Sequence, residues 1–234
     1  MLGGESQPRA GQQRRFVRRV REAWPDSWRS FWRLQGRFRL GEVGCKVVER
    51  RGLKRFQARA YMLFAAHLMP CTRHLRAGRE LLRRSSEIAN ESGDLSSAGY
   101  SCVDLIENLL AGGGSLIEVQ AEAEHALDFA EKSQFGLIVD IITSQLGLVR
   151  MLRGLTRNFG SFDDEHFDER REDHFASAAE GWYQNPRLQA HFHAGDYASA
   201  VNIATSLEQL PAKFRLPADC GKDGQRTPLE IKKR

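Results

Sequence analysis

The residues best suited to chemistry lie in one acidic stretch of the C-terminal half. Residues 155–173 read LTRNFGSFDDEHFDERRED, with His166 among the carboxylates and His174 directly after them; the six clustered acids are Asp163, Asp164, Glu165, Asp168, Glu169 and Glu172. Carboxylates and imidazole can bind a divalent metal ion. The spacing, however, matches neither an EF-hand loop nor an HExxH helix. Because runs of charge are usually solvated, we favour a solvated acidic loop, with a metal site as the alternative.

Arginine and aromatic residues are concentrated at the other end of the chain. Residues 1–40 contain ten arginines and three acidic residues, a balance of +7, so residues 41–234 carry −2 of the total of +5. Arginine with interleaved aromatics can bind phosphates and stack on bases, or lie on an anionic membrane. We favour instead a poorly ordered arm, or a partial helix whose aromatics pack on its neighbour, because charged runs without a recognisable module are usually tails. The basic excess then belongs to the arm and not to the folded body.

Other chemical motifs are weak or missing. His191 and His193 are two residues apart, so on a helix they point in different directions and make a poor metal pair. The sequence has no GxxxxGK[ST] phosphate loop, no kinase glycine-rich loop, and no HRD or DFG motif. We therefore predict a protein that is not an enzyme, with no catalytic, cofactor-binding or metal-binding residue and no cofactor.

The composition is that of a chain able to bury a core in water. It has 234 residues, of which 41% are hydrophobic and 28% charged. The longest apolar run, Tyr61 to Met69, is well short of the ~20 residues that span a bilayer, and the start lacks an apolar signal region. Four cysteines lie far apart without a CxxC pair, which predicts reduced thiols. These features favour a cytoplasmic protein without a transmembrane segment.

Apolar spacing predicts consecutive helices joined at short turns, several of them marked by glycine. Pro70 ends the first of them, because proline disfavours helical geometry in the residue before it. Asp94 is a good N-cap, and Ser115 with Glu118 has the pattern of a capping box. The predicted helices cover residues 54–69, 72–91, 94–110, 115–131 and 135–153.

The last of these helices is apolar most of the way round, which is typical of a helix buried on several sides. We predict that its residues Ile142 and Leu146 are among the most buried side chains. The preceding helices each have a single apolar stripe, and these stripes include Leu82, Ser85 and Ala89; Leu95, Ala98, Cys102, Ile106 and Leu109; and Leu116, Val119, Ala123, Ala126 and Ala130.

The helices repeat with a long period. Successive pairs begin near Asp94 and Phe135, a step of 41 residues, which exceeds the ~34 of tetratricopeptide repeats and is near that of other α-solenoids. Gly195-Asp196-Tyr197 with Ala200 has the pattern of a hairpin turn, in which glycine permits the turn, aspartate caps, and tyrosine and alanine pack. We predict an all-α protein, a tetratricopeptide-like α-solenoid of antiparallel helix hairpins with disordered or irregular termini.

The sequence also resembles a known helical region. The run YMLFAAHLMPCTRHLRAGRELLRRSSEIANESGDLSSAGYSCVDLIENLLAGG is similar to the tetratricopeptide-like repeat region of very large bacterial signalling proteins, as are LIEVQAEAEHALDFAEKSQF, GSFDDEHFDE and WYQNPRLQAHFHAGDYASAV. The likeness covers roughly residues 42–210 and is strongest at Ser92-Gly-Asp94 and Gly195-Asp-Tyr197. Those proteins join a serine/threonine kinase-like domain, an AAA-type ATPase, this region, a GAF domain and a sensor histidine kinase. The resemblance implies a part in signal transduction.

We therefore divide the chain into a basic arm (1–41), a helical repeat domain (42–210, with the acidic loop at 155–173) and a tail (211–234) whose composition is that of disorder. The predicted function is a non-catalytic helical-repeat segment for protein–protein interaction or domain coupling in a bacterial signal-transduction ATPase or kinase, as a whole protein or as a fragment of one. The alternative is a nucleic-acid-associated regulator that binds through the arm.

The expected partners are a protein or flanking domains, with no small-molecule substrate identified. Self-association is also expected, because the ends of the stack are predicted to leave aromatic side chains partly uncovered. These side chains are Phe56, Tyr61 and Phe64 at one end and Trp182 and Tyr183 at the other.

Overall fold

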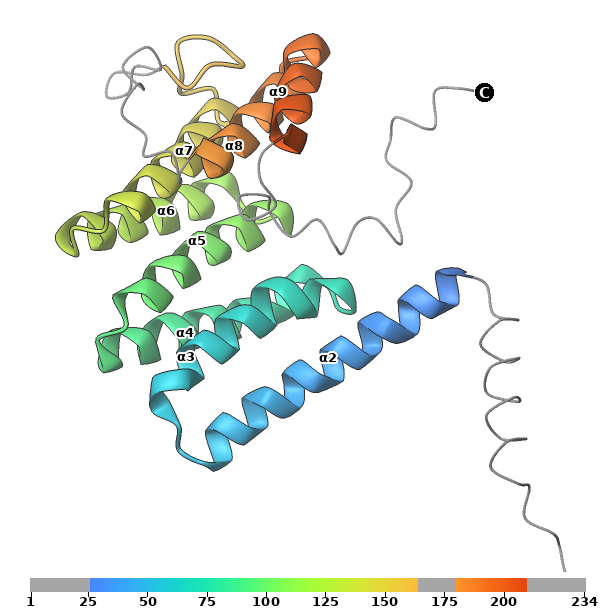
Figure 1. Ribbon diagram of the computed structural model, residues 1–234. Coiled ribbons are helices and arrows are strands. Elements are labelled where there is room, and N and C mark those ends of the chain that lie inside the picture. The colour runs from blue at the N-terminus through green and yellow to red at the C-terminus, as the bar shows by residue number, and fades with distance from the viewer. Residues whose placement is uncertain (1–25, 164–179, 210–234) are drawn as a thin grey trace, which may run out of the picture.

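A computed structural model describes residues 26–163 and 180–209, and within these ranges the chain is helical and contains no strand (Figure 1). This confirms the all-α prediction for the described residues. The α-helices are α2 (Asp26–Arg50), α3 (Lys54–Leu63), α4 (Arg79–Ser92), α5 (Leu95–Ala111), α6 (Leu116–Lys132), α7 (Gly136–Leu152), α8 (Glu180–His193) and α9 (Tyr197–Gln209). Three short elements connect α3 to α4: a π-helical turn η1 (Phe64–Leu68) and the 3₁₀ turns η2 (Met69–Cys71) and η3 (Leu75–Gly78).

Three of the helices follow one another at a constant interval. α3, α5 and α7 begin at residues 54, 95 and 136, so each starts 41 residues after the one before. The step of 41 residues is therefore present in the described structure, and it extends back to α3. α9 begins at residue 197, which means that the connection between α7 and α9 is 20 residues longer than the other two.

The same joint precedes each of these helices. A residue with a positive φ closes the helix before it, and the following amide N–H donates to a carbonyl five residues back, as in a Schellman motif. The residues with positive φ are Gly52 (62°), Gly93 (70°), Gln134 (51°) and Gly195 (80°). The corresponding donors and acceptors are Leu53 to Val48, Asp94 to Ala89, Phe135 to Ala130 and Asp196 to His191, at 2.9–3.1 Å.

Consecutive helices pack against one another from α2 to α9, and α5 also contacts both α3 and α7 (Figure 1). α3, α5 and α7 are therefore neighbours in a row. α4 packs against α3 and α5, and α6 packs against α5 and α7.

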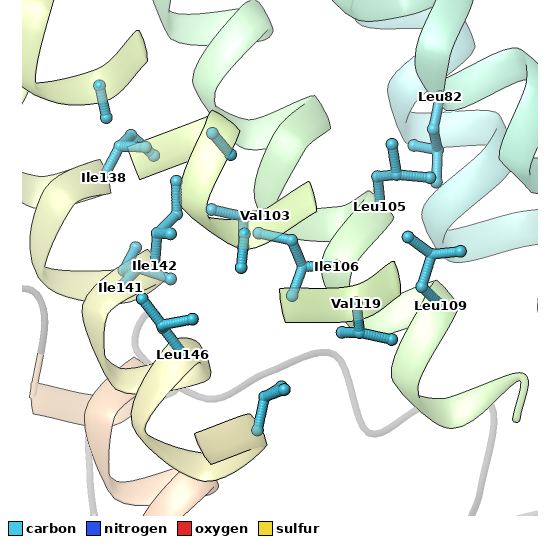
Figure 2. Packing of buried hydrophobic residues seen from close by; sticks show 14 of the residues in the cluster. Leu82, Val103, Leu105, Ile106, Leu109, Val119, Ile138, Ile141, Ile142 and Leu146 are labelled. Carbon is cyan, nitrogen blue, oxygen red and sulfur yellow. The ribbon is translucent and has the colours of Figure 1, made fainter. Parts of the chain in front are cut away.

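The largest core lies where α4, α5, α6 and α7 meet, and Figure 2 shows side chains of α5 and α7 directed into it. Ile142 is fully buried and Leu146 is 3% exposed, so the prediction for both residues is confirmed. Most of the predicted stripe residues are also buried, although Leu95 is 44% exposed. Leu95 lies in the first turn of α5, beyond the region that the neighbouring helices cover.

Two predictions about helix starts are wrong. The helix expected from residue 72 begins at Arg79, because the preceding residues form the separate turn η3, in which His74 Nδ1 accepts from the Arg76 N–H at 3.2 Å. Ser115 does precede α6, but its hydroxyl makes no capping hydrogen bond. It is exposed, so water can satisfy the first amides of the helix. Asp94, in contrast, accepts from the Ser97 N–H at 3.1 Å, as predicted.

The N-terminal end of the fold differs from the expected arm. The division at residue 41 falls inside α2, and Phe38 is buried in contact with Phe64, with ring centroids 5.2 Å apart. Because α2 covers α3 and η1, Tyr61 and Phe64 are buried and the expectation that they are partly uncovered is wrong, whereas Phe56 is 58% exposed. The expectations for residues 1–25, for residues 164–173 of the acidic stretch and for the tail lie outside the described residues.

At the other end, Tyr183 is also buried, in edge-to-face contact with Phe162 at 6.3 Å. The hairpin turn before α9 is only partly as predicted. Asp196 caps α9 by accepting from the Ser199 N–H at 3.1 Å and Ala200 is buried, but Tyr197 is 60% exposed. Tyr197 packs instead on the exposed ring of Phe192, outside the core.

The cysteines divide into two kinds. Cys45 and Cys102 are free thiols, as expected. Cys71 is disulfide-bonded, which contradicts the expectation of reduced thiols for that residue.

We expect Ile142→Ala to lower the free energy of unfolding by about 2–5 kcal/mol, because a large buried side chain is lost and a cavity remains. The matched control is Ile117→Ala in α6, where the side chain is 66% exposed and the expected loss is below about 0.5 kcal/mol. Urea unfolding of both variants measures the difference. A loss below about 1 kcal/mol for Ile142→Ala would show that α7 is not central to the core.

The crossing of α2 over η1 depends on glycine. A Cβ atom at Gly41 would lie 2.6 Å from both Leu68 Cδ1 and Phe64 Cδ2, whereas one at Gly36 in the same helix meets nothing within 4 Å. We expect Gly41→Ala to destabilise the chain by about 1–3 kcal/mol through overpacking, and Gly36→Ala to stabilise it by up to about 1 kcal/mol through helix propensity. Equal effects of the two substitutions on thermal unfolding would contradict this packing of α2.

Candidate functional site: a cavity between α5, α7 and α8

A cavity of about 510 Å³ lies between α5, α7 and α8. Its walls are largely apolar and include Ile106, Leu110, Leu148, Leu152 and Pro186. Its polar lining comes from Glu107, Gln145, Asn185, Gln189 and His193. This combination of apolar walls and a few polar groups is typical of a ligand-binding pocket, and the volume is within the usual range of ~300–1,000 Å³.

The 41-residue step explains how α5 and α7 line the cavity together. Glu107 on α5 and Leu148 on α7 are 41 residues apart, and so are Asp104 and Gln145. Equivalent faces of the two helices therefore carry these side chains. α8 closes the cavity from the side after the longer connection that follows α7.

Gln145 is the most constrained polar residue of the site. It is 4% exposed, and its Nε2 atom donates to Val103 O and to Glu107 Oε1, both at 3.3 Å. Because a backbone carbonyl can only accept, the amide cannot be turned over without losing the bond to Val103. The Oε1 atom is then left buried, and it has no hydrogen-bond partner in the part of the chain that the structure describes.

Two carboxyl groups lie one turn apart on α5. Burial raises the pKa of Asp104 to about 8, and the neighbouring Glu107 carboxylate adds to this rise. Burial also raises the pKa of Glu107, against the opposing effect of the hydrogen bond from Gln145. Both residues keep some exposure, so they are shielded from bulk water without being sealed off. Among the described residues, no basic side chain forms an ion pair with either of them.

The charge of the folded body is divided between its two halves. Residues 26–92 contain 15 basic and six acidic residues, whereas residues 93–163 contain four basic and ten acidic residues. The expectation that the basic excess belongs to the arm alone is therefore wrong, because α2 to α4 are basic as well. Part of this basic charge packs on aromatic rings, with Arg73 over Phe38 at 5.1 Å and Arg84 over Tyr61 at 5.4 Å. The cavity lies in the acidic half.

The histidines singled out in the sequence are not brought to a common site. His193 lines the cavity, whereas His191 Nδ1 lies 3.3 Å from Asp196 Oδ2 at the turn into α9. Within residues 26–163 and 180–209, no group of three or more His, Cys, Asp or Glu side chains is placed to hold a metal ion. Of the acidic stretch, only its first carboxylate, Asp163, falls within these ranges.

Sequence reasoning missed Asp104, Glu107 and Gln145. A signal for them existed, because the 41-residue step aligns Asp104 with Gln145 on the face of each helix that the apolar stripe leaves free. The contribution of α8 had no such signal, since the step is interrupted before it.

Comparisons with protein-family models, with curated proteins and with solved structures find no match to this chain. The resemblance to the repeat region of bacterial signalling proteins therefore stays a prediction. None of the helices in the described ranges is long and apolar enough to cross a membrane.

We expect the stability of the chain to fall as the pH rises from about 4 to about 8. The pKa of Asp104 is about 8 in the folded state against 3.8 as its ordinary value, so the folded state holds the proton more tightly and loses this advantage as the carboxyl ionises. Asp104→Asn removes the effect. Its free energy of unfolding relative to the native chain should be about 1–3 kcal/mol more favourable at pH 8 than at pH 5.

The matched control for this measurement is Glu131→Gln, which removes an exposed carboxyl of α6. Urea unfolding at the two pH values is the assay. If Asp104→Asn and Glu131→Gln leave the same dependence on pH as the native chain, Asp104 is not held in a shielded site.

Proposed function

We propose that this chain is a non-catalytic helical-repeat module, a tetratricopeptide-like α-solenoid that binds a protein partner. The repeated joint and the 41-residue step of α3, α5 and α7 support the repeat architecture. Stacked helical hairpins expose extended surfaces suited to binding a segment of another protein.

The cavity between α5, α7 and α8 is the observation that carries the binding role. It lies between two successive members of the row, where a binding surface of stacked repeats is expected. Its apolar walls can take up side chains of a partner, and its polar lining can fix their orientation.

The resemblance to multidomain signalling proteins supports a setting for this module. In that setting it acts in the cytoplasm, beside ATPase and sensor histidine kinase domains, and either couples these flanking domains or recruits a further protein. The module itself carries out no catalysis in this proposal, since the sequence contains no phosphate-binding loop or kinase motif.

A peptide selection with the full chain tests the proposal. Displayed random peptides are selected on the immobilised protein, and we expect enriched peptides that compete with one another. Asn185→Trp should block them, because the new side chain fills a cavity that Asn185 lines from a partly exposed position. The matched control is Asn202→Trp on the exposed face of α9, which should leave binding unchanged.

Two outcomes contradict the proposal. One is a selection that enriches no peptide beyond the level of blank beads. The other is binding that Asn185→Trp does not affect. Tight binding of ATP to the full chain, measured by calorimetry, would contradict the non-catalytic part of the proposal.

A further inference from the structure

We infer that the cavity between α5, α7 and α8 receives an arginine side chain of the partner, with the guanidinium group between Glu107 and Gln145 and the methylene chain along the apolar wall. This inference rests on the proposed function and names the chemistry of the segment that is bound.

The first argument is the unsatisfied acceptor. Gln145 lines the cavity, and its buried Oε1 has no hydrogen-bond partner among the described residues. A buried acceptor without a partner costs about 1–3 kcal/mol, and such atoms are rare in folded proteins. A ligand that brings an N–H donor into the cavity relieves this cost.

The second argument is charge. Glu107 supplies a carboxylate directly beside the Gln145 amide, and Asp104 lies one turn away on α5. Neither carboxyl group has a cationic partner within the described ranges. A cation in the cavity would favour the ionised form of both groups, whereas a neutral donor such as an amide would leave two shielded carboxyls uncompensated.

The third argument distinguishes arginine from lysine. The guanidinium group is planar, presents five donors in a fixed fork and is more weakly hydrated than an ammonium group. One guanidinium can therefore donate to the Glu107 carboxylate and to Gln145 Oε1 together. The aliphatic part of the side chain can pack on Leu110, Leu148 and Leu152, which line the same cavity.

The test uses two synthetic pentapeptides that differ in one residue. The first is acetyl-Ala-Leu-Arg-Leu-Ala-amide, and the second has citrulline, the uncharged isostere, in place of arginine. Both are titrated into the full chain at millimolar concentration and followed by NMR chemical shifts. We expect the arginine peptide to bind about tenfold more tightly or better, which is the usual size of the gain from a charge-assisted hydrogen bond.

Three protein variants locate the effect. Glu107→Gln should reduce the preference for arginine to less than about threefold. Gln189→Lys adds a cation at a partly exposed position of the lining and should weaken the arginine peptide alone, so the test survives if Glu107→Gln fails to fold. Glu131→Gln on α6 is the control and should leave the preference unchanged.

The inference is overturned if the two peptides bind equally, if neither binds, or if the preference for arginine survives both Glu107→Gln and Gln189→Lys. These results leave the proposed function standing when the peptide selection still enriches ligands that Asn185→Trp blocks. Failure of the selection itself removes both.

Discussion

One backbone constraint sets the architecture of this chain. At each joint before α3, α5, α7 and α9, a residue with a positive φ ends one helix, and the next amide bonds back to a carbonyl of the helix just completed. The chain therefore reverses within two residues and starts the next helix at a fixed angle. Glycine supplies the left-handed conformation at three of these joints, while Gln134 adopts it at the fourth. Repetition of this joint at residues 52, 93 and 134 places α3, α5 and α7 in a row.

Side chains then fix each pair of helices at its other end. Arg79 Nε donates to Asn108 Oδ1 at 3.1 Å, Asn108 Nδ2 donates to Leu75 O at 2.8 Å, and Arg76 Nε donates to Gly112 O at 3.2 Å. These bonds satisfy carbonyls at the C-terminus of α5, where positive charge is also favourable. They hold the face of α5 that bears Asn108 against the start of α4. Glu107 is consequently turned toward α7 and Gln145, and the cavity follows from this orientation.

The sequence predicted those features that depend on local chemistry. The cap at Asp94, the glycine at 93, and the burial of Ile142 and Leu146 all follow from residue type and spacing, and all are present. Features that depend on a partner far along the chain were missed. Phe38 is buried because η1 crosses α2 at Gly41, and Tyr183 is buried because Phe162 reaches it. The polar residues of the cavity were missed for the same reason, since the bond between Gln145 and Glu107 spans 38 residues.

The central claim is that the chain is a stack of equivalent 41-residue units, and deletion of one unit tests it most directly. Removal of residues 95–135 joins Asp94 to Gly136, so that α7 follows the joint that now precedes α5. Because units of a solenoid contact only their neighbours and contribute roughly additively to stability, we expect the shortened chain to be helical, to unfold cooperatively and to be less stable than the native chain. Deletion of residues 95–131 breaks the step and should leave the chain unfolded. Equal behaviour of the two deletions, measured by circular dichroism during thermal unfolding, would contradict the account.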